Sequence, residues 1–338
     1  MKIMITGGTG FIGSHTVAEL VNKGHEVRLL ARKPERVQKA LKSFDLDDQV
    51  ESVVGDVTDE HSIEKAAKGC DATIHCGSVY SLDPRMAKVI NKTNVSGTDI
   101  VIRTAHKLGH DPIVHVSSIM ALIGKKCDVL SPSTQPGNPK GAYNSSKAKS
   151  DIIARGYQKE GIPVVITYPG SVWGPNDPHL GESCQMAISI LKRLWSITPK
   201  GMVSITDVRD LAKLHAAIME KDRGPRRYIA PVVNMSLKQT MALFESQTGR
   251  KIPTLSLPPW MLLWPMRVLD YLQKFIPFRF PVNYQAVYCV GLASTMDDSK
   301  TREEFGILPR PVEETLADTI RWMVKERYLS PNLAGRLA

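Results

Sequence analysis

The chain has 338 residues, of which 42% are hydrophobic and 23% charged, a composition typical of a globular protein with a sizeable buried core. This length exceeds one typical domain and predicts either two lobes or one large α/β unit. The formal net charge of +10 would suit an anionic cofactor, an acidic membrane surface or nucleic acid. Because the sequence has no arginine-rich run and no basic stripe interleaved with aromatic residues, we expect no nucleic-acid partner.

The five cysteines form no C-x-x-C pair, which argues against a zinc site and against a disulfide framework. We therefore expect no bound metal and a reducing compartment. The N-terminal segment MKIMITGG lacks the long apolar stretch of a secretory signal and is typical of a β-strand. Together these features predict a cytoplasmic protein.

Strands and helices alternate along the first half of the chain. The apolar run 2–6 stops at two glycines and predicts a strand, and apolar residues then recur at helical spacing until Gly24. The same reasoning predicts, in chain order, a strand at 26–31, a helix at 34–42, a strand at 50–54, a helix at 59–68, a strand at 72–76, a long helix at 86–108, a strand at 113–116, a helix that carries Tyr143 and a strand at 164–168. This alternation predicts an α/β protein with a Rossmann-type, doubly wound parallel sheet.

The alternation weakens after residue 175, where a second lobe is expected to begin. Ser236 and Gln239 have the spacing of a capping box at the start of a helix. The helices predicted in this half are 186–194, 207–221, 236–248 and 312–326. The domain boundaries that we expect are a Rossmann domain at 1–175, a return of 203–232 to that domain, and a smaller α/β substrate lobe formed mainly by 176–338.

The segment GGTGFIG places Gly7, Gly10 and Gly13 between the first strand and the first helix. Glycines let the backbone turn tightly and approach a phosphate that a Cβ atom would obstruct. The N-terminus of the following helix then meets the pyrophosphate of a dinucleotide. Because the segment lies at the start of a βαβ pattern, we favour a dinucleotide fingerprint over a purely structural glycine turn.

The spacing GxxGxxG, rather than GxGxxG, resembles the extended branch of the short-chain dehydrogenase/reductase superfamily. Two departures from its pattern stand out: Cys76 and Gly77 replace alanines, and Tyr168 replaces an arginine. The further segments that match the family in order are GDVTD (55–59), IHCGS (74–78), NVSGT (94–98), VHVSSIMALIG (114–124), YPGSVWGP (168–175), DVRDLA (207–212) and MDDSKTREEFGILP (296–309).

The resemblance implies a bound nicotinamide dinucleotide. Asn94 resembles a helix asparagine that supports the family's lysine through water, although a purely structural role is nearly as well supported. Including the residues discussed in the next two paragraphs, the predicted cofactor-binding residues are Gly7, Thr9, Gly10, Phe11, Ile12, Gly13, Arg32, Lys33, Asp56, Val57, Cys76, Gly77, Ser78, Asn94, Ser117, Tyr143, Lys147, Tyr168, Pro169, Gly170 and Val172.

The end of the second strand indicates which dinucleotide binds. A carboxylate at this position would hold a ribose 2′-hydroxyl and repel a 2′-phosphate. The sequence HEVRLLARKPERV has no carboxylate there and offers Arg32 and Lys33 instead. Because a guanidinium suits a phosphate dianion, we favour NADP(H), with NAD as the alternative; both cations could also be solvated helix-cap charges.

The stretch GAYNSSKAKS places Tyr143 and Lys147 one helical turn apart on the same face. Reduction of a carbonyl needs a proton donor, and a nearby ammonium is expected to lower the pKa of a tyrosine. By resemblance, Lys147 also holds the nicotinamide ribose. Ser118 at the end of the fifth strand is the predicted third catalytic residue, with Ser117 as the alternative. His75 and His115 are expected to be core residues.

The segment 255–282 is aromatic, proline-broken and partly basic. It is too interrupted to predict a membrane-spanning helix. We expect it either to pack on the substrate lobe or to lie at a membrane surface. In both cases the substrate side is apolar, which predicts a small hydrophobic carbonyl or alcohol substrate. By resemblance to the family, a homodimer is a further expectation.

Within the extended branch, the sequence most resembles the 3β-hydroxysteroid dehydrogenase/dihydroflavonol reductase group. This resemblance implies an NADP(H)-dependent oxidoreductase that interconverts a ketone or aldehyde and an alcohol on a steroid-, flavonoid- or lipid-like substrate. A nucleotide-sugar epimerase or dehydratase with tightly bound NAD is an alternative, because it shares every motif as far as Lys147. A non-catalytic NADP-sensing protein is a further alternative, although such relatives usually lose the tyrosine or the lysine.

Overall fold

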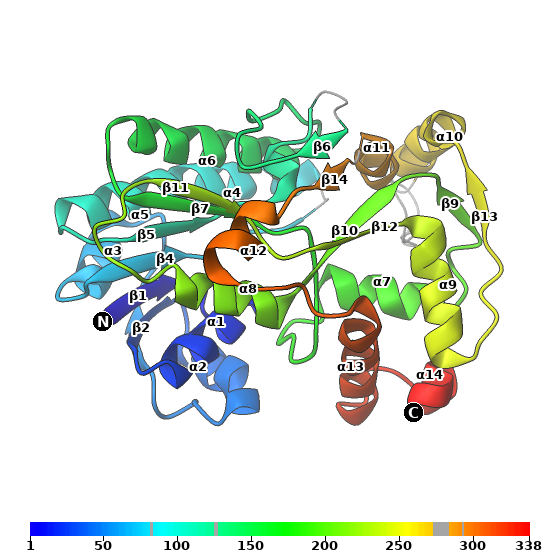
Figure 1. Ribbon diagram of the computed structural model, residues 1–338, viewed down its shortest axis with the longest axis horizontal. Coiled ribbons are helices and arrows are strands. Elements are labelled where there is room, and N and C mark those ends of the chain that lie inside the picture. The colour runs from blue at the N-terminus through cyan, green and yellow to red at the C-terminus, as the bar shows by residue number, and fades with distance from the viewer. Residues whose placement is uncertain (82–83, 125–127, 273–283, 293) are drawn as a thin grey trace.

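A seven-stranded parallel sheet forms the larger lobe in the computed structural model, which describes residues 1–81, 84–124, 128–272, 284–292 and 294–338. The strand order is β11-β7-β5-β4-β1-β2-β3 (Figure 1), so the order reverses between β1 and β4. These strands are β1 (Lys2–Thr6), β2 (Glu26–Ala31), β3 (Glu51–Val54), β4 (Ala72–His75), β5 (Ile113–Val116), β7 (Val164–Tyr168) and β11 (Arg226–Ile229).

Helices cover both faces of this sheet, as Figure 1 shows. In β1, Ile3 and Ile5 belong to the core under α1, α2 and α8, whereas Met4 faces the core under α3 and α5. This alternation follows from the two-residue period of a strand, and a sheet buried on both faces needs apolar residues at both phases. The helices are α1 (Phe11–Asn22), α2 (Pro34–Leu41), α3 (Glu60–Ala67), α5 (Gly97–Lys107), α6 (Ala142–Lys159) and α8 (Val208–Ala217). The predicted Rossmann-type α/β fold is confirmed.

The long helix predicted at 86–108 is interrupted. It consists of α4 (Ala87–Ile90), a π-helical turn (Asn91–Ser96) and α5. The turn contains Asn94, whose side chain is buried and bonded to neighbouring segments rather than to its own helix. Wide turns of this kind occur mostly as single turns and often at functional sites.

The smaller lobe surrounds a three-stranded sheet with the order β12-β10-β8. Its core contains Trp173, Phe244 and Ile320. β8 precedes the expected domain boundary at residue 175, yet it pairs with β10, and the chain rejoins the large sheet at β11. The predicted capping box of Ser236 and Gln239 begins α9. The elements of this lobe are β8 (Ser171–Trp173), α7 (Glu182–Leu191), β9 (Ile197–Pro199), β10 (Met202–Asp207), β12 (Val233–Ser236), α9 (Leu237–Thr248), β13 (Leu255–Leu257), α10 (Pro259–Leu272), α11 (Tyr284–Leu292), α13 (Val312–Lys325) and α14 (Pro331–Ala334).

The remaining elements link the two lobes. α12 (Ser299–Phe305) contacts α8 and β11 of the larger lobe. β6 (Val129–Leu130) pairs with β14 (Thr295–Met296). Late segments of the chain therefore return to the first half.

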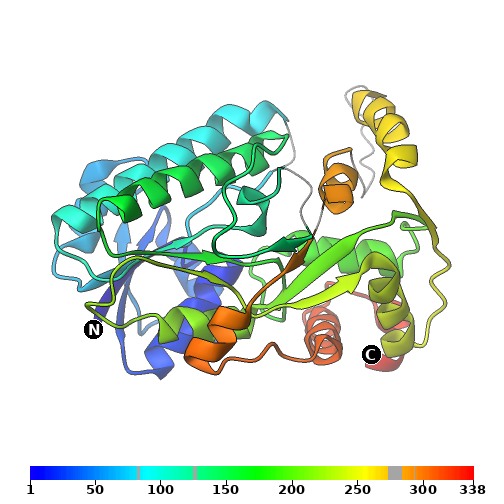
Figure 2. The same ribbon diagram turned by 45° about the horizontal axis from the view of Figure 1, so that its top comes forward.

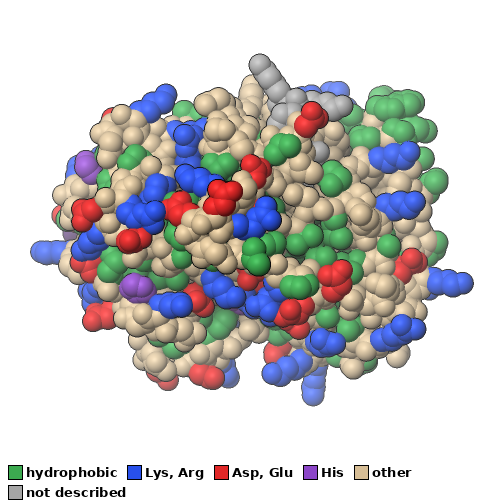
Figure 3. Space-filling model, viewed as in Figure 1, with side chains coloured by type: hydrophobic (Ala, Val, Ile, Leu, Met, Phe, Trp, Pro, Cys, Tyr) green, Lys and Arg blue, Asp and Glu red, His purple; other side chains and the backbone are tan. Residues whose placement is uncertain are grey.

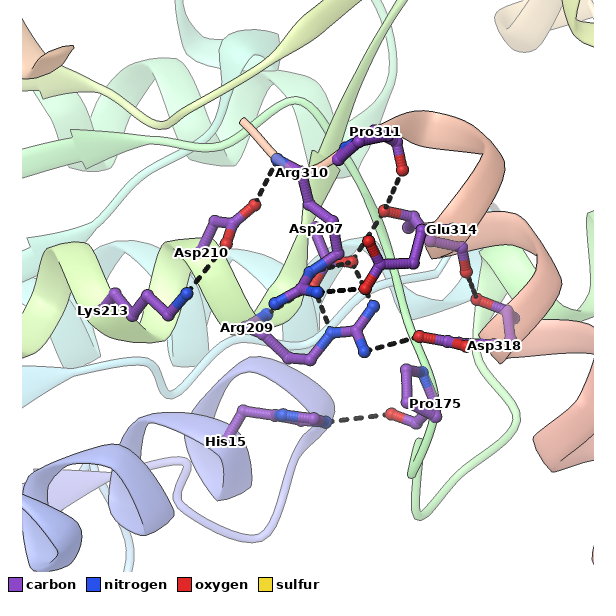
Figure 4. Close-up of polar contacts among 12 residues, drawn as sticks. His15, Pro175, Asp207, Arg209, Asp210, Lys213, Arg310, Pro311, Glu314 and Asp318 are labelled. Carbon is purple, nitrogen blue, oxygen red and sulfur yellow. Dashed lines mark hydrogen bonds and ion pairs between the residues drawn. The ribbon is translucent and has the colours of Figure 1, made fainter. Parts of the chain in front are cut away.

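An ion network around Asp207 fastens the C-terminal segment to α8 (Figure 4). Asp207 is the N-cap of α8 and accepts from the backbone N–H of Arg209 at 2.8 Å. The guanidinium of Arg209 bonds Asp207 and also Asp318 of α13, in both cases at 2.7 Å. The hydroxyl of Thr315 donates to Asp207 at 2.7 Å, and Arg310 lies 3.7 Å from the same carboxylate. A single buried carboxylate thus pairs with two guanidinium groups and caps one helix.

We expect Asp207→Asn to lower the free energy of unfolding by about 3 kcal/mol, because it removes a buried carboxylate and leaves two partly buried guanidinium groups without their shared counter-charge. Burial acts to raise the pKa of Asp207, but the hydrogen bonds from Arg209 and Thr315 outweigh it and hold the pKa below its usual value. The stabilisation is therefore present above the unfolded-state pKa and is lost as the pH falls through the folded-state pKa. Guanidinium denaturation at neutral and acidic pH measures both effects.

Asp318→Asn is the matched control. Its side chain is 29% exposed and it binds the outer side of Arg209, so its replacement should cost at most about 1 kcal/mol. Equal losses for the two variants would contradict the central role of Asp207.

Candidate functional site

The predicted site residues gather at the carboxyl edge of the large sheet. Parallel strands end at the same edge, and in open α/β sheets ligands bind there, at the point where the strand order reverses. That point lies between β1 and β4. Residues 7–13 follow β1, 32–33 follow β2, 56–57 follow β3, 76–78 follow β4, 117–118 follow β5 and 168–172 end or follow β7.

The glycine loop is closely packed against the segment after β4. Gly7 has a φ of +73°, and a Cβ atom there would lie 2.6 Å from the backbone carbon of Cys76. A Cβ on Gly13 would lie 2.2 Å from the carbonyl oxygen of Gly7. Side chains at these two positions would push the loop out of its conformation.

The first turn of α1 is open to an anion. Its N-cap is Gly10, no side chain caps it, and the turn holds no acidic residue. Phe11 and Ile12 begin the helix, and Thr9 is partly exposed before it. Uncapped N–H groups at a helix N-terminus favour a phosphate. The loop and the helix start therefore fit the pyrophosphate of a dinucleotide.

The segments after β2 and β3 flank this loop. Arg32 and Lys33 are exposed; Lys33 lies 3.8 Å from Glu35, whereas Arg32 has no ion pair with any residue that the structure describes. Asp56 accepts hydrogen bonds from the N–H and hydroxyl of Thr58 at 2.9 and 2.8 Å. Val57 packs close to Gly77 and Gly97. The cation expected to face a 2′-phosphate is thus available.

The segment after β4 is fixed by the central helix. The Asn94 side chain accepts from the N–H of Val79 at 2.7 Å and donates to its carbonyl and to the Ser146 hydroxyl, both at 3.0 Å. This arrangement matches the structural role considered for Asn94. Burial raises the pKa of the Cys76 thiol to about 12, so the thiol stays neutral. Gly77 donates its N–H to the Thr6 hydroxyl at 3.3 Å, and Ser78 is exposed.

Two histidines near this segment are core residues. His75 lies between the hydroxyls of Thr6, at 2.6 Å, and Thr98, at 3.3 Å. His115 stacks on it with ring centroids 5.7 Å apart. Burial lowers the pKa of His75 to about 3 and holds the pKa of His115 well below its usual value. Both rings are therefore neutral near pH 7.

Tyr143 and Lys147 lie one turn apart in α6, and the side chain of Ser118 forms a hydrogen bond with Tyr143. Lys147 is buried and donates to the Val116 carbonyl oxygen at 3.3 Å. Ser118 also accepts from the N–H of Met120 at 3.2 Å, which holds it at the end of β5. The structure thus brings these three side chains together at the sheet edge.

The expected direction of the Tyr143 pKa is wrong for this structure. Burial raises the pKa of Tyr143 to about 12, the hydrogen bond with Ser118 acts in the opposite direction, and the charge of Glu182 raises it further. Burial also lowers the pKa of Lys147 to about 8. Desolvation opposes both charged forms, and here it outweighs the attraction that the sequence suggested.

Ser117 and Tyr168 belong to a second network, behind the edge. Ser117 donates to Asp151 at 3.1 Å, and Asp151 forms a buried ion pair of 2.7 Å with Arg155. Arg155 also donates to the Tyr168 hydroxyl at 2.9 Å. Tyr168 is fully buried, and its hydroxyl belongs to this network. It occupies the position of the family's arginine, while α6 supplies the guanidinium of Arg155.

The other predicted residues of this segment lie between the lobes. Pro169 is buried and accepts from the N–H of Ile119 at 3.0 Å. Gly170 donates to Thr206 at 3.2 Å, and Val172 packs against the core beneath the large sheet. These positions connect β7 with the small sheet.

Sequence reasoning missed the residues that approach Tyr143 from elsewhere. The Tyr80 ring lies edge-on to it at 4.5 Å. Glu182, at the start of α7, raises the pKa of Tyr80 and of Tyr143. Cys289 of α11 accepts from Asn144 at 3.1 Å. None of the three lies in a recognisable motif, since each reaches the site only through the tertiary fold.

Comparison with known proteins places this geometry in a family. A family model described as the NAD dependent epimerase/dehydratase family matches residues 3–230. A putative dihydroflavonol 4-reductase of Synechocystis sp. is 28% identical, over 96% of this chain and 95% of that protein. Sterol demethylase protein B of Methylococcus capsulatus is 27% identical, over 95% of this chain and 98% of that protein.

Solved structures share the fold. DesIV, a dTDP-glucose 4,6-dehydratase from Streptomyces venezuelae solved with NAD and TYD bound, has a TM-score of 0.75 at 22% identity and covers 98% of this chain and 100% of its own. The terminal R domain of the myxalamid PKS-NRPS pathway has a TM-score of 0.78 at 19% identity and covers 97% of this chain and 92% of its own.

We expect Gly13→Ala to weaken dinucleotide binding at least tenfold, because its Cβ would displace the Gly7 carbonyl. Isothermal titration with NADPH and with NADH measures the loss, and a thermal melt establishes that the variant is folded. Gly156→Ala in α6 is the matched control, because a Cβ there meets no atom within 4 Å. A folded Gly13→Ala protein with unchanged binding would show that the loop does not hold the dinucleotide.

Proposed function

We propose that this chain, which belongs to the NAD-dependent epimerase/dehydratase family and is an NAD(P)-dependent oxidoreductase of the short-chain type, interconverts a ketone or aldehyde with an alcohol on a hydrophobic substrate. The single observation that supports this best is the cluster of Ser118, Tyr143 and Lys147 at the carboxyl edge of the sheet, beside the glycine loop. NADPH is the favoured cofactor.

In this proposal each residue of the cluster has one role. Nicotinamide, when bound, supplies or accepts the hydride. Tyr143 gives its phenolic proton to the oxygen of the carbonyl, or takes it back in the other direction. Ser118 hydrogen-bonds the same oxygen, and the Lys147 ammonium stabilises the phenolate that Tyr143 leaves behind. The raised pKa of Tyr143 keeps its proton in place at neutral pH, which suits a donor in the reducing direction.

The surroundings of Tyr143 favour a neutral, apolar substrate. Tyr80 supplies apolar surface against Tyr143, and Cys289 lies against the neighbouring Asn144. The charge that acts on Tyr143 from the second lobe is that of Glu182. A carboxylate whose charge acts on Tyr143 would disfavour the diphosphate of a nucleotide sugar nearby. The relatives that cover almost the whole chain include a ketoreductase and a sterol demethylase protein. In sequence, the dTDP-glucose dehydratases of Streptomyces antibioticus and Mus musculus match only 52% of it, although DesIV shares the fold over 98% of the chain.

The alternatives make different predictions. A nucleotide-sugar epimerase or dehydratase would copurify with stoichiometric NAD and be protected by a sugar nucleotide. A non-catalytic sensor would bind NADPH and turn over no carbonyl, a reading that the presence of both Tyr143 and Lys147 disfavours.

Tyr143→Phe should lower kcat at least a thousandfold while NADPH binding changes less than threefold, because it removes the proton donor and keeps the ring. NADPH oxidation across a panel of lipophilic ketones, aldehydes and 3-oxosteroids measures turnover, with titration for the cofactor. Retained turnover would contradict the role of Tyr143.

The adjacent serines provide a matched pair for the same assay. Ser118→Ala should lower kcat about a hundredfold, since an oriented donor to a developing oxyanion is worth roughly that much. Ser117→Ala should preserve most of it, because Ser117 donates to Asp151 instead. A larger loss of kcat in Ser117→Ala than in Ser118→Ala would assign the catalytic role to Ser117.

Arg32→Ala should raise the KM for NADPH by about ten- to a hundredfold and leave that for NADH nearly unchanged, because one charge-assisted contact to the 2′-phosphate is lost. Lys33→Ala should have a smaller effect, since Lys33 lies near Glu35. Steady-state kinetics with both cofactors measures this, and a native preference for NADH would contradict the interpretation of Arg32.

A further inference from the structure

One helix of the smaller lobe turns an apolar face to solvent. Trp260, Trp264, Val268 and Leu272 recur at four-residue spacing along α10 and therefore share one face. Trp260 is 73% exposed and Trp264 is 74% exposed. Leu262 is the single buried residue of this helix, all of which the structure describes. Monomeric proteins seldom leave such a contiguous apolar patch without a partner.

The apolar surface continues onto the adjoining sheet edge. β13 leads into α10 and pairs with β9, where Leu255 lies opposite Ile197. Both side chains are at least half exposed, as is the neighbouring Leu194. Figures 1 and 2 show this edge and α10 at the end of the molecule that lies farthest from β1.

The two segments that carry this surface, 192–200 and 250–272, hold almost only basic charges. Figure 3 shows the apolar side chains at the upper right, with basic groups along the same edge. Asp270 is the one acidic residue of 192–200 and 250–272, and it accepts the N–H of Tyr284 at 3.1 Å, in α11. The basic residues of these two segments are Lys192, Arg193, Lys200, Arg250, Lys251 and Arg267.

We propose that the α10 face, defined as Trp260, Trp264, Val268 and Leu272 with the basic residues of 192–200 and 250–272, docks the protein on an anionic lipid bilayer. Indole rings favour the interfacial layer, where an apolar body and a polar N–H are both accommodated. Clustered lysine and arginine near the surface add electrostatic attraction to anionic headgroups.

Two observations indicate that α10 binds at the surface of a membrane rather than crossing it or pairing with a second copy of the chain. Within the described residues, no helix has the length and apolar character needed to cross a bilayer, so α10 lies on the surface. A second copy of the chain would bring an equally basic face against this one, and like charges would oppose that pairing. An anionic membrane complements both the apolar and the charged component.

The docking helix is also one helix away from Tyr143. α10 packs on α11, and in α11 Cys289 accepts a hydrogen bond from Asn144 while Tyr288 lies under the Lys140 ammonium at 5.3 Å. Gln285 lies against Gly141, directly before α6. A lipophilic substrate dissolved in the bilayer would therefore reach the site from the docked side. This last consequence rests on the proposed function, whereas the docking itself does not.

Sedimentation of the full chain with phosphatidylcholine vesicles, with and without about one-third phosphatidylserine, tests the proposal. We expect binding to the anionic vesicles, weakened by salt, and at least tenfold weaker partitioning of the double variant Trp260→Ser, Trp264→Ser. The matched control is Ile152→Ser, Leu308→Ser, at 57% and 69% exposed positions elsewhere, which should bind as the native chain does. Thermal melts establish that all variants are folded.

Three outcomes would overturn the proposal: absence of vesicle binding by the native chain, equal binding by the tryptophan variant, or binding indifferent to phosphatidylserine. A concentration-dependent dimer in analytical ultracentrifugation, abolished by the tryptophan variant and without vesicle binding, would assign the face to a second copy instead. Because no substrate is present, a negative result here leaves the proposed reductase activity untouched.

Discussion

The buried ion pair between Asp151 and Arg155, through its bonds to Ser117, Tyr168 and Thr134, anchors the helix on which the site depends. Both groups lie on α6 and are buried, so each requires the other to offset its desolvation. Residues four apart share a face, which means that Tyr143, Lys147, Asp151 and Arg155 form one line along α6. A rotation of the helix would break the bonds that these two groups make outside it, from Ser117 to Asp151 and from Arg155 to the Tyr168 hydroxyl and the Thr134 carbonyl. These bonds at one end of the line therefore help to fix the direction of the tyrosine and the lysine at the other.

The same pair explains why two adjacent serines differ. Ser117 and Ser118 leave the end of β5 in opposite directions, as neighbours on an extended chain must. Ser117 meets Asp151, and Ser118 meets Tyr143. Tyr168 closes the buried network with its hydroxyl where the family has a charged residue. In this chain the cation beside Asp151 is Arg155 of α6, and the fully buried ring of Tyr168 fills the core.

The fold could be predicted because its signals are local. Strand and helix periods, the glycine loop and the capping box at Ser236 each lie within a few residues of one another. The site could be predicted only in part. The motif residues lie at the sheet edge, as the sequence predicts. Tyr80, Glu182 and Cys289 come close to them only through long-range packing, which produces no periodic pattern in the sequence. The predicted direction of the Tyr143 pKa shift was wrong for a related reason. Burial is a property of the assembled structure, and its effect on the pKa outweighs the charge of one neighbour.

Within the smaller lobe, some large aromatic side chains are fully buried, whereas Trp260 and Trp264 of α10 are exposed to solvent. Asp207 and its arginines fasten α13 against α8, and the core beneath contains Trp173 and Phe244 at most 2% exposed. The two tryptophans of α10 stay in water, although burying a large apolar side chain yields roughly 1.5–3 kcal/mol. A lobe that buries Trp173 and Phe244 so thoroughly forgoes several kcal/mol at this face. That cost is offset only where the face meets an apolar surface outside the molecule, and the basic rim selects an anionic one.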